Sequence, residues 1–262
     1  MNVQDIYDII DAFAPFSLQE GYDRAGLLVG DPKRNVSRVL LTLDITVPVI
    51  KEAAECGADL ILSHHPVIWD PIRTISPAHP VWHLVKHDIA AICAHTNVDI
   101  ADGGLNDRFG AILRTFLPLG EFGPLAQLPG GRVLGRTAEL AKPMRADDLA
   151  GMLKNTLYCG ALRWYPGEQA DSLKRLAWCT GSGGDLIADA IRAGADALIT
   201  GDCKHSVWAE AQNRNFTLFD CGHFETEVPV VQLFADVLKK AAPELDIRIS
   251  AEGTKPFFKT AE

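Results

Sequence analysis

The sequence has no cluster of positive charge. Its 262 residues carry a formal net charge of −9, and no five-residue window forms a basic run. Binding to nucleic-acid backbones depends on gathered Lys and Arg side chains, which neutralise phosphates. We therefore expect no nucleic-acid partner.

Long apolar stretches are also missing. No run approaches the roughly 18 apolar residues of a membrane-spanning helix, so we expect no membrane association. The first residues, 1–19, mix Asp5, Asp8 and Asp11 into apolar positions, which is unlike a secretory signal or a transit peptide. The sequence favours a cytoplasmic location.

Paired cysteine motifs are absent as well. Six cysteines are scattered along the chain, and none forms a C-x-x-C pair. This spacing favours buried thiols in a reducing compartment over disulfides or a thiolate metal site.

Short apolar runs alternate with helical patterns, which predicts an α/β fold built from parallel βαβ units. The predicted strands of the first half are 39–43, 60–62 and 89–94, with a helix at 47–56 ended by Gly57. The second half has predicted strands at 176–179, 197–200 and 216–219, with a helix at 185–192.

Two sequence blocks recur in the same order in both halves. Residues 57–63 (GADLILS) match 194–200 (GADALIT), and 93–99 (CAHTNVD) match 221–227 (CGHFETE). The second pair shares the form Cys-small-His-x-x-x-acid. Such repeats indicate a duplicated structural unit.

A Gly- and Pro-rich stretch, 117–132, separates the halves. We predict an N-terminal α/β lobe at 1–125 and a related C-terminal lobe at 126–262. The two βαβ-type lobes are expected to pack together, with a metal site at the strand C-terminal edge between them.

Adjacent histidines, His64 and His65, follow the predicted strand at 60–62. Ligands of open α/β sheets bind at the carboxyl ends of the strands. Because successive side chains of a strand diverge, the two imidazoles can serve two different ions.

His95-x-x-x-Asp99 and His223-x-x-x-Glu227 also follow strands. Residues four apart share one face if the chain turns into a helix. Imidazole with carboxylate suits zinc, iron, manganese or nickel, and the spacing does not choose among them. We expect Glu227 to bridge two ions, Asp99 to serve one, and His95 at most to support them.

Other polar residues at strand ends are weaker candidates. Asp44 and Asp202 are predicted either to support a ligand or to act as a general base. The turn at 181–184 (GSGG) could hold an anion or only make a tight bend. His79, His83 and His87 are expected on the solvated face of a short helix.

Taken together, these motifs resemble the Nif-three-like dinuclear metal centre proteins, which are also known as GTP cyclohydrolase I type 2 homologues. The resemblance is carried by D-x-x-G-L-x-V-G at 23–30, L-D-I-T at 43–46, GADLILSHHP at 57–66 and HTNVD at 95–99. The second half adds G-S-G at 181–183, T-G-D at 200–202, and Gly222-His223 with Thr226-Glu227.

The resemblance implies two divalent metal ions in one site. Its ligands would be His64, His65, Asp99, His223 and Glu227. It also implies a homohexamer, and the short stretch between Asp99 and Leu176 resembles the short form without an inserted middle domain. Two segments depart from the family pattern: Tyr22-Asp23-Arg24 stands in place of Trp-Asp-Asn, and Ser206 in place of a histidine.

The leading hypothesis for function is a metal-dependent hydrolase acting on a small nucleotide-like or phosphorylated substrate, with water activated by the two ions. The alternative is a non-enzymatic metal-binding scaffold or regulatory adaptor that acts through protein partners. The sequence alone does not support GTP as the substrate.

Overall fold

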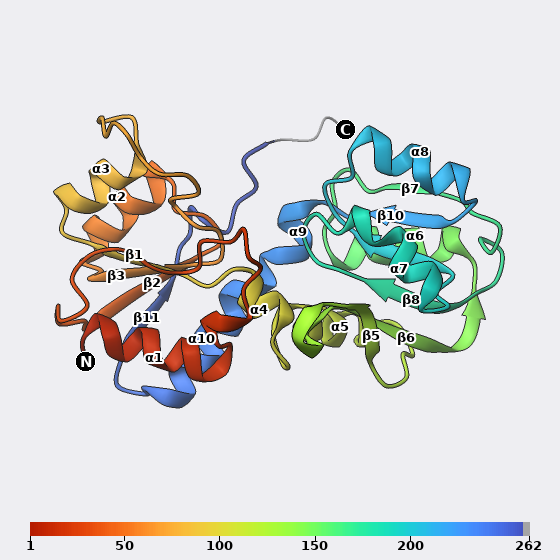
Figure 1. Cartoon of the computed structure of the whole chain (residues 1–262), viewed down its shortest axis with the longest axis horizontal. Coiled ribbons are helices and arrows are strands. Elements are labelled where there is room, and N and C mark those ends of the chain that lie inside the picture. Colours follow the sequence, from red (N-terminus) through yellow and green to blue (C-terminus); the bar gives the residue numbers. More distant parts are fainter. Residues whose placement is uncertain (259–262) are drawn as a thin grey trace. The chain divides into compact units, whose positions relative to one another are not determined.

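The computed structural model describes residues 1–258, and the chain divides into two compact units (Figure 1). The first unit contains Met1–Ala101 and Val230–Phe257, and the second contains Asp102–Pro229. Each is an α/β unit built on its own sheet. The predicted α/β class with two lobes is confirmed.

The sheet of the first unit has the strand order β1-β4-β3-β2-β11. The strands are β1 (Gly26–Val29), β2 (Arg38–Thr42), β3 (Leu60–Ser63), β4 (Ala90–Cys93) and β11 (Asp246–Ile249). β2 is parallel to β3 and β11, β3 is parallel to β4, and β1 is antiparallel to β4. The central strands are buried on both faces, which explains their continuous apolar runs.

Helices cover both faces of this sheet. Figure 1 shows α2 (Val47–Cys56) and α3 (Pro80–Lys86) on one side of the strands, and α1 (Val3–Phe13) and α10 (Pro229–Ala241) on the other. A short 3₁₀ turn, η1 (Phe16–Leu18), follows α1, and α4 (Thr96–Ile100) follows β4. The Thr46 hydroxyl caps the start of α2, and Gly57 ends the helix in the left-handed conformation, as predicted.

The second unit has a sheet of order β5-β6-β8-β9-β10-β7. Its strands are β5 (Gly123–Gln127), β6 (Val133–Met144), β7 (Arg163–Tyr165), β8 (Leu173–Trp178), β9 (Ala197–Thr200) and β10 (Thr217–Asp220). The helices are α5 (Leu105–Arg114), α6 (Ala146–Thr156), α7 (Ile187–Arg192), α8 (His205–Asn213) and α9 (His223–Glu227), with 3₁₀ turns η2 (Pro129–Gly131) and η3 (Gly184–Leu186).

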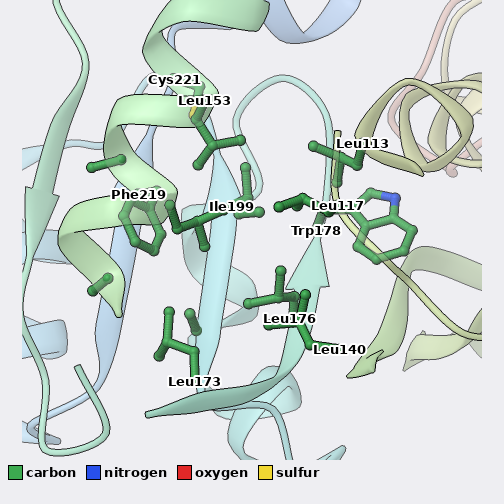
Figure 2. Packing of buried hydrophobic residues seen from close by; sticks show 14 of the residues in the cluster. Leu113, Leu117, Leu140, Leu153, Leu173, Leu176, Trp178, Ile199, Phe219 and Cys221 are labelled. Atoms are coloured by element: carbon green, nitrogen blue, oxygen red, sulfur yellow. The ribbon is translucent and has the colours of Figure 1, made fainter. Parts of the chain in front are cut away.

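Alternate residues of the central strands pack on opposite faces of this sheet. Leu176, Ile199 and Phe219 pack with Leu113 of α5 and Leu153 of α6 (Figure 2). Their strand neighbours Ala177, Leu198 and Leu218 pack instead against α7 and α8. This alternation follows from the two-residue period of a strand. The parallel pairing of β8, β9 and β10 places their carboxyl ends side by side.

The predicted duplication is visible in the topology, and it extends further than the sequence indicated. β2-α2-β3-α3-β4 and β8-α7-β9-α8-β10 are both parallel βαβαβ units. Each is also flanked by an antiparallel strand on its last member, β1 on β4 and β7 on β10. The short strands β1 and β7 share no sequence block, so only the structure shows their correspondence.

The aspartates of the repeated GAD segments perform the same local task. Asp59 Oδ2 accepts hydrogen bonds from the backbone N–H groups of Ser37 and Arg38, and Asp196 Oδ2 accepts those of Lys174 and Arg175. Each carboxylate therefore holds the start of the neighbouring parallel strand. The repeat is structural here and not a site for chemistry.

The predicted division into 1–125 and 126–262 differs from the observed one, in which the second unit begins at Asp102 and the chain returns to the first unit at Val230. The Gly- and Pro-rich stretch is no linker: it contains β5, which pairs with β6 inside the second unit. Pro124 is tolerated because β5 is an edge strand. After Pro229 the chain returns to the first unit, where β11 pairs with β2 from Asp246↔Arg38 to Ile249↔Leu41.

Within residues 1–258, no helix has both the length and the apolar character that crossing a membrane requires. The six cysteines all lie in this range and are free thiols, five of them buried.

Candidate metal centre

Polar side chains of the first unit gather where β2, β3 and β4 end. His64 and His65 follow β3, Asp44 follows β2, and His95 and Asp99 follow β4. The ligand nitrogens of His64, His65 and His95 all lie within 4.8 Å of one another. The structure therefore confirms that this edge of the sheet collects imidazoles.

Each of the three imidazoles is anchored through Nδ1. His64 Nδ1 lies 2.9 Å from the backbone oxygen of Ala94, and His65 Nδ1 lies 2.8 Å from Asp44 Oδ1. His95 Nδ1 lies 2.8 Å from Asp23 Oδ1. An oxygen acceptor opposite Nδ1 places the proton on that nitrogen, so Nε2 is the nitrogen that would bind a metal ion. This is the tautomer that a ligand histidine needs.

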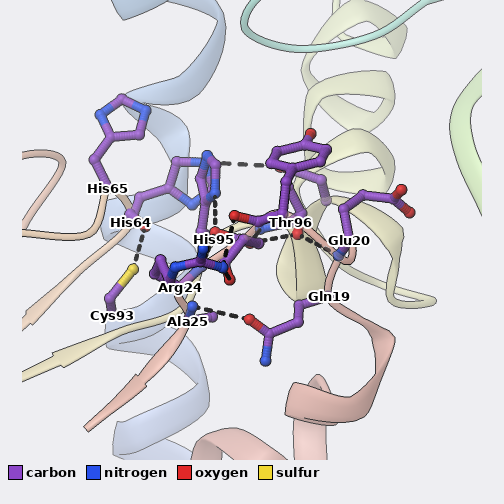
Figure 3. A network of polar contacts seen from close by, with 12 residues as sticks. Gln19, Glu20, Arg24, Ala25, His64, His65, Cys93, His95 and Thr96 are labelled. Atoms are coloured by element: carbon purple, nitrogen blue, oxygen red, sulfur yellow. Dashed lines mark hydrogen bonds and ion pairs between the residues drawn. The ribbon is translucent and has the colours of Figure 1, made fainter. Parts of the chain in front are cut away.

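His64 is fully buried, and its Nε2 lies 3.7 Å from Asp99 Oδ1. The thiol of Cys93 donates a hydrogen bond to the backbone oxygen of His64 (Figure 3), which ties the end of β3 to β4. An imidazole and a carboxylate at this separation leave room for one ion that both could bind.

Asp23 belongs to the site, although sequence analysis gave it no role. Its carboxylate accepts hydrogen bonds from His95 Nδ1 and from both the N–H and the hydroxyl of Thr96. Burial by itself would raise the pKa of Asp23, but the interactions with His95, Thr96 and the Arg24 N–H outweigh it, so that the pKa lies below its ordinary value. Asp23 is therefore ionised and suited to hold the His95 ring.

The loop that carries Asp23 is itself fastened (Figure 3). The Glu20 N–H donates to the Thr96 hydroxyl, and the Ala25 N–H donates to Gln19 Oε1. The bond to Thr96 joins the loop to α4 over 76 positions of sequence, so no local sequence pattern predicts it.

His95 lies nearer to the other candidate ligands than the sequence-based expectation suggested. It was expected to support the ligands at most, yet it stands within the cluster with the two adjacent histidines. The signal was present in the repeat, because His95 occupies the position of His223 in the Cys-small-His-x-x-x-acid block. The same logic that selected His223 applies to His95.

The second unit supplies a histidine–carboxylate pair on α9. Gly222, with φ of 89°, turns the chain sharply from β10 into this short helix. His223 and Glu227 then share one face, with Nε2 and Oε2 2.8 Å apart. Glu227 is 4% exposed, and buried carboxylates are usually paired with a cationic group or coordinate a metal.

Asp202 occupies a place like that of Asp44. Its Oδ2 lies 3.5 Å from His223 Nδ1, as Asp44 Oδ1 lies next to His65 Nδ1. Both aspartates thus contact Nδ1 of a candidate ligand, so that Nε2 is the nitrogen that would bind an ion. Of the two roles that the sequence left open, this contact is the one expected of a group that orients a ligand.

The glycine-rich turn supports Glu227. The Gly181 N–H donates to the Thr226 hydroxyl, and the Gly183 N–H donates to Thr200 Oγ1, so neither is available to an external anion. Gly181 has φ of +66°, and a Cβ atom there would lie 2.0 Å from Glu227 Oε1. Glycine is required because the carboxylate passes directly over this backbone.

The variant Gly181→Ala is expected to displace Glu227 and weaken metal binding by about tenfold or more, in the range found for groups that support ligands. Gly194→Ala is the matched control, since Gly194 has φ of +73° and no atom within 4 Å of an added Cβ. Both variants should lose roughly 1 kcal/mol of stability through backbone strain. Metal analysis and denaturant unfolding separate the effects, and equal metal content in both would contradict this reading of Gly181.

His79, His83 and His87 lie on α3 or at its ends. His79 caps the helix start through the Val81 N–H, and His83 contacts the Pro77 backbone oxygen. His79 and His83 are half-buried and His87 is exposed. Their contacts are those of structural residues, in keeping with their exclusion from the predicted metal site.

These features define an α/β protein of duplicated architecture that presents imidazoles and carboxylates at the carboxyl ends of its parallel strands. The chain belongs to the Duf34/NIF3 (NGG1p interacting factor 3) family, whose profile matches residues 1–256.

Relatives of the same family align over nearly the whole chain. A GTP cyclohydrolase 1 type 2 homolog of Clostridium perfringens is 36% identical over 98% of this chain and 99% of its own length. NIF3-like protein 1 of Drosophila melanogaster is 30% identical over 90% of this chain and 81% of its own. A Staphylococcus aureus relative aligns over 364 positions, so it carries inserted residues that this 262-residue chain lacks, as the resemblance to the short form implied.

Solved structures show the same fold. The Staphylococcus aureus hypothetical protein SA1388 superimposes with a TM-score of 0.89, 27% identity and 99% coverage of both chains. Reduced HcgD from Methanocaldococcus jannaschii gives a TM-score of 0.80 and 28% identity, covering 95% of this chain and 97% of its own.

Proposed function

We propose that the chain is a dinuclear metal-dependent hydrolase acting on a small nucleotide-like or phosphorylated substrate. The observation that supports it most is the cluster of three imidazoles, each with Nδ1 held by an oxygen acceptor. Such prepared nitrogen donors match zinc, iron, manganese or nickel. The residues present therefore fit the metal ions implied by the family resemblance.

The proposed ligands are His64, His65, Asp99, His223 and Glu227, with His95 added from the structure. That all of them serve a single pair of ions is inferred from the duplicated blocks and from donor chemistry. When bound, two divalent ions supply Lewis acidity, which activates water and stabilises developing negative charge.

The protein's own groups would prepare this site in three ways. Asp23 and Asp44 fix the rings of His95 and His65, so little reorganisation is needed. Buried Glu227 adds negative charge that attracts cations. Asp202 contacts Nδ1 of His223 and is proposed to orient that ring in the same way.

The proposal predicts close to two transition-metal equivalents per chain, measured by elemental analysis of protein purified from metal-replete cells. The same preparation should hydrolyse at least one member of a panel of phosphoesters and nucleotides that includes GTP. Hydrolysis should stop after chelation and return with added metal. A reproducible metal content of zero would refute the proposal, because both the metal centre and the hydrolysis depend on bound metal.

The scaffold or adaptor function remains the second candidate, and the family's description as an interacting factor favours it. It predicts two tightly held ions with no turnover of any substrate in the panel. Open coordination positions indicate catalysis, whereas complete coordination by protein indicates a structural role.

We further propose a homohexamer, in which closed symmetry joins identical surfaces. Light scattering should give about six times the chain mass of 28.5 kDa. A monomer at micromolar concentration would contradict the assembly but not the metal site. The free thiols support a reducing compartment, and we propose the cytoplasm.

A further inference from the structure

An aromatic side chain stands beside the histidine cluster of the first unit. Trp69 follows His65 by four positions, in the loop that leaves β3. Its ring centroid lies 5.2 Å from that of His95, with the two ring planes at 90°. One edge of the histidine cluster is thus bordered by an indole.

Trp69 is not a core residue. It is 46% exposed, whereas the largest buried side chains of the chain are below 2%. It is also not needed to hold the His95 ring, because Asp23 already binds Nδ1 and is itself held by Thr96. A large aromatic surface is therefore left open next to the proposed metal ligands.

Several prolines and one side-chain contact restrict the loop that carries this ring. The loop, residues 66–79, contains Pro66, Pro71 and Pro77, and each proline ring fixes the φ angle of its own residue. The His83 ring contacts the backbone oxygen of Pro77, which fastens the far end of the loop to α3. A ring held in advance loses little conformational entropy when a ligand stacks on it.

Positive charge lies close to the same place. Arg24 is exposed and directly follows Asp23, and its guanidinium donates to the backbone oxygens of Tyr22 and Asp23. Its backbone N–H binds the Asp23 carboxylate. An open aromatic face, a cation and a set of metal ligands together suit a ligand with a planar ring and an anionic group.

We propose that Trp69 determines substrate class by stacking on a planar heterocycle, so that nucleotide-like molecules are preferred over sugar phosphates that lack a base. This rests on the proposed function, because it assigns a recognition residue to that metal centre. Stacking of one base on an aromatic side chain contributes roughly 1–3 kcal/mol, which corresponds to about 5- to 150-fold in affinity.

The test compares two ligands on metal-loaded protein by titration calorimetry: adenosine 5′-monophosphate, which has a base, and ribose 5-phosphate, which has none. Trp69→Ala should lower the affinity for adenosine 5′-monophosphate by about tenfold and leave the affinity for ribose 5-phosphate unchanged. Trp69→Phe should retain most of the affinity, since it keeps an aromatic face. Trp82→Ala is the control, because Trp82 is 42% exposed on α3 and has no ring contact with the histidines among residues 1–258.

Several results would overturn the assignment. Wild-type protein that binds both ligands equally would exclude a stacking site, as would a Trp69→Ala affinity within about twofold of wild type. Equal weakening of both ligands, or a fall in metal content, would mean that Trp69 only supports His95. A changed assembly mass without a change in nucleotide affinity would make it an interface residue. Selective nucleotide binding without any hydrolysis would support this inference while refuting the proposed hydrolase.

Discussion

Replacing Glu227 by Gln is expected to remove most of the bound metal, from both positions of the pair. The substitution keeps the size and shape of a side chain that is 4% exposed, and it removes only the charge. Groups that merely support ligands change metal affinity by roughly 10- to 100-fold, so the loss of a charged ligand shared by two ions should exceed about 100-fold. Elemental analysis after dialysis, with calorimetric titration of zinc, measures the change.

Glu225→Gln is the matched control, because it makes the same chemical change two residues earlier on α9. Glu225 is half-buried, and burial raises the pKa of its carboxyl group. It belongs to none of the candidate metal-binding groups found among residues 1–258, so its replacement should leave the metal content unchanged. Two equivalents of metal retained in Glu227→Gln would show that this carboxylate is not a shared ligand.

His95→Ala is expected to lower the metal content by about one equivalent, since it deletes one of three imidazoles whose ligand atoms lie within 4.8 Å of one another. His87→Ala, at an exposed position after α3, is the control and should have no effect. Elemental analysis of both variants decides between the structural assignment and the earlier expectation, under which His95→Ala would keep its metal.

Asp23→Asn tests the carboxylate that holds the His95 ring through Nδ1. An amide can still accept a hydrogen bond from Nδ1, but it removes the charge that stabilises the polarised ring. We expect metal affinity to fall by roughly 10- to 100-fold without the full loss seen in His95→Ala. Identical effects of the two variants would indicate that His95 binds no ion and that both substitutions act through the local fold.

Asp99→Asn completes the division of roles among the carboxylates. Asp99 lies 3.7 Å from His64 Nε2, in the first unit, and is proposed to serve one ion. The Asp99→Asn variant should lose about one metal equivalent, whereas Glu227→Gln should lose both. Equal losses in the two variants would contradict this division, although they would leave the metal site itself in place.

Much of the site could be found from the sequence because the relevant signals are local. Apolar runs predicted the strands, and the polar residue that follows each run marked the edge of the sheet where side chains converge. The repeated Cys-small-His-x-x-x-acid block then selected His223 and Glu227. If the repeat had been used to choose ligands in both halves, it would also have selected His95.

Other parts depended on contacts between residues far apart in the chain. Asp23 was read only as part of a family motif, because its partners His95 and Thr96 are more than 70 positions away. β11 could not be assigned to the first unit, because its partner β2 lies 208 positions earlier at the Arg38–Asp246 contact. The stretch before Arg132 looked like a linker because Gly and Pro mark both linkers and edge strands.

The sequence by itself determined the α/β class, the duplicated units and most of the candidate ligands, since periodicity, turn residues and repeats are properties of neighbouring residues. Only the tertiary structure decided which oxygen holds each imidazole, why Gly181 must be glycine, and where the chain leaves and rejoins the first unit. Those features are hydrogen bonds and close approaches between distant segments. They depend on how apolar faces pack, and packing is specified by the whole chain and not by any local stretch of it.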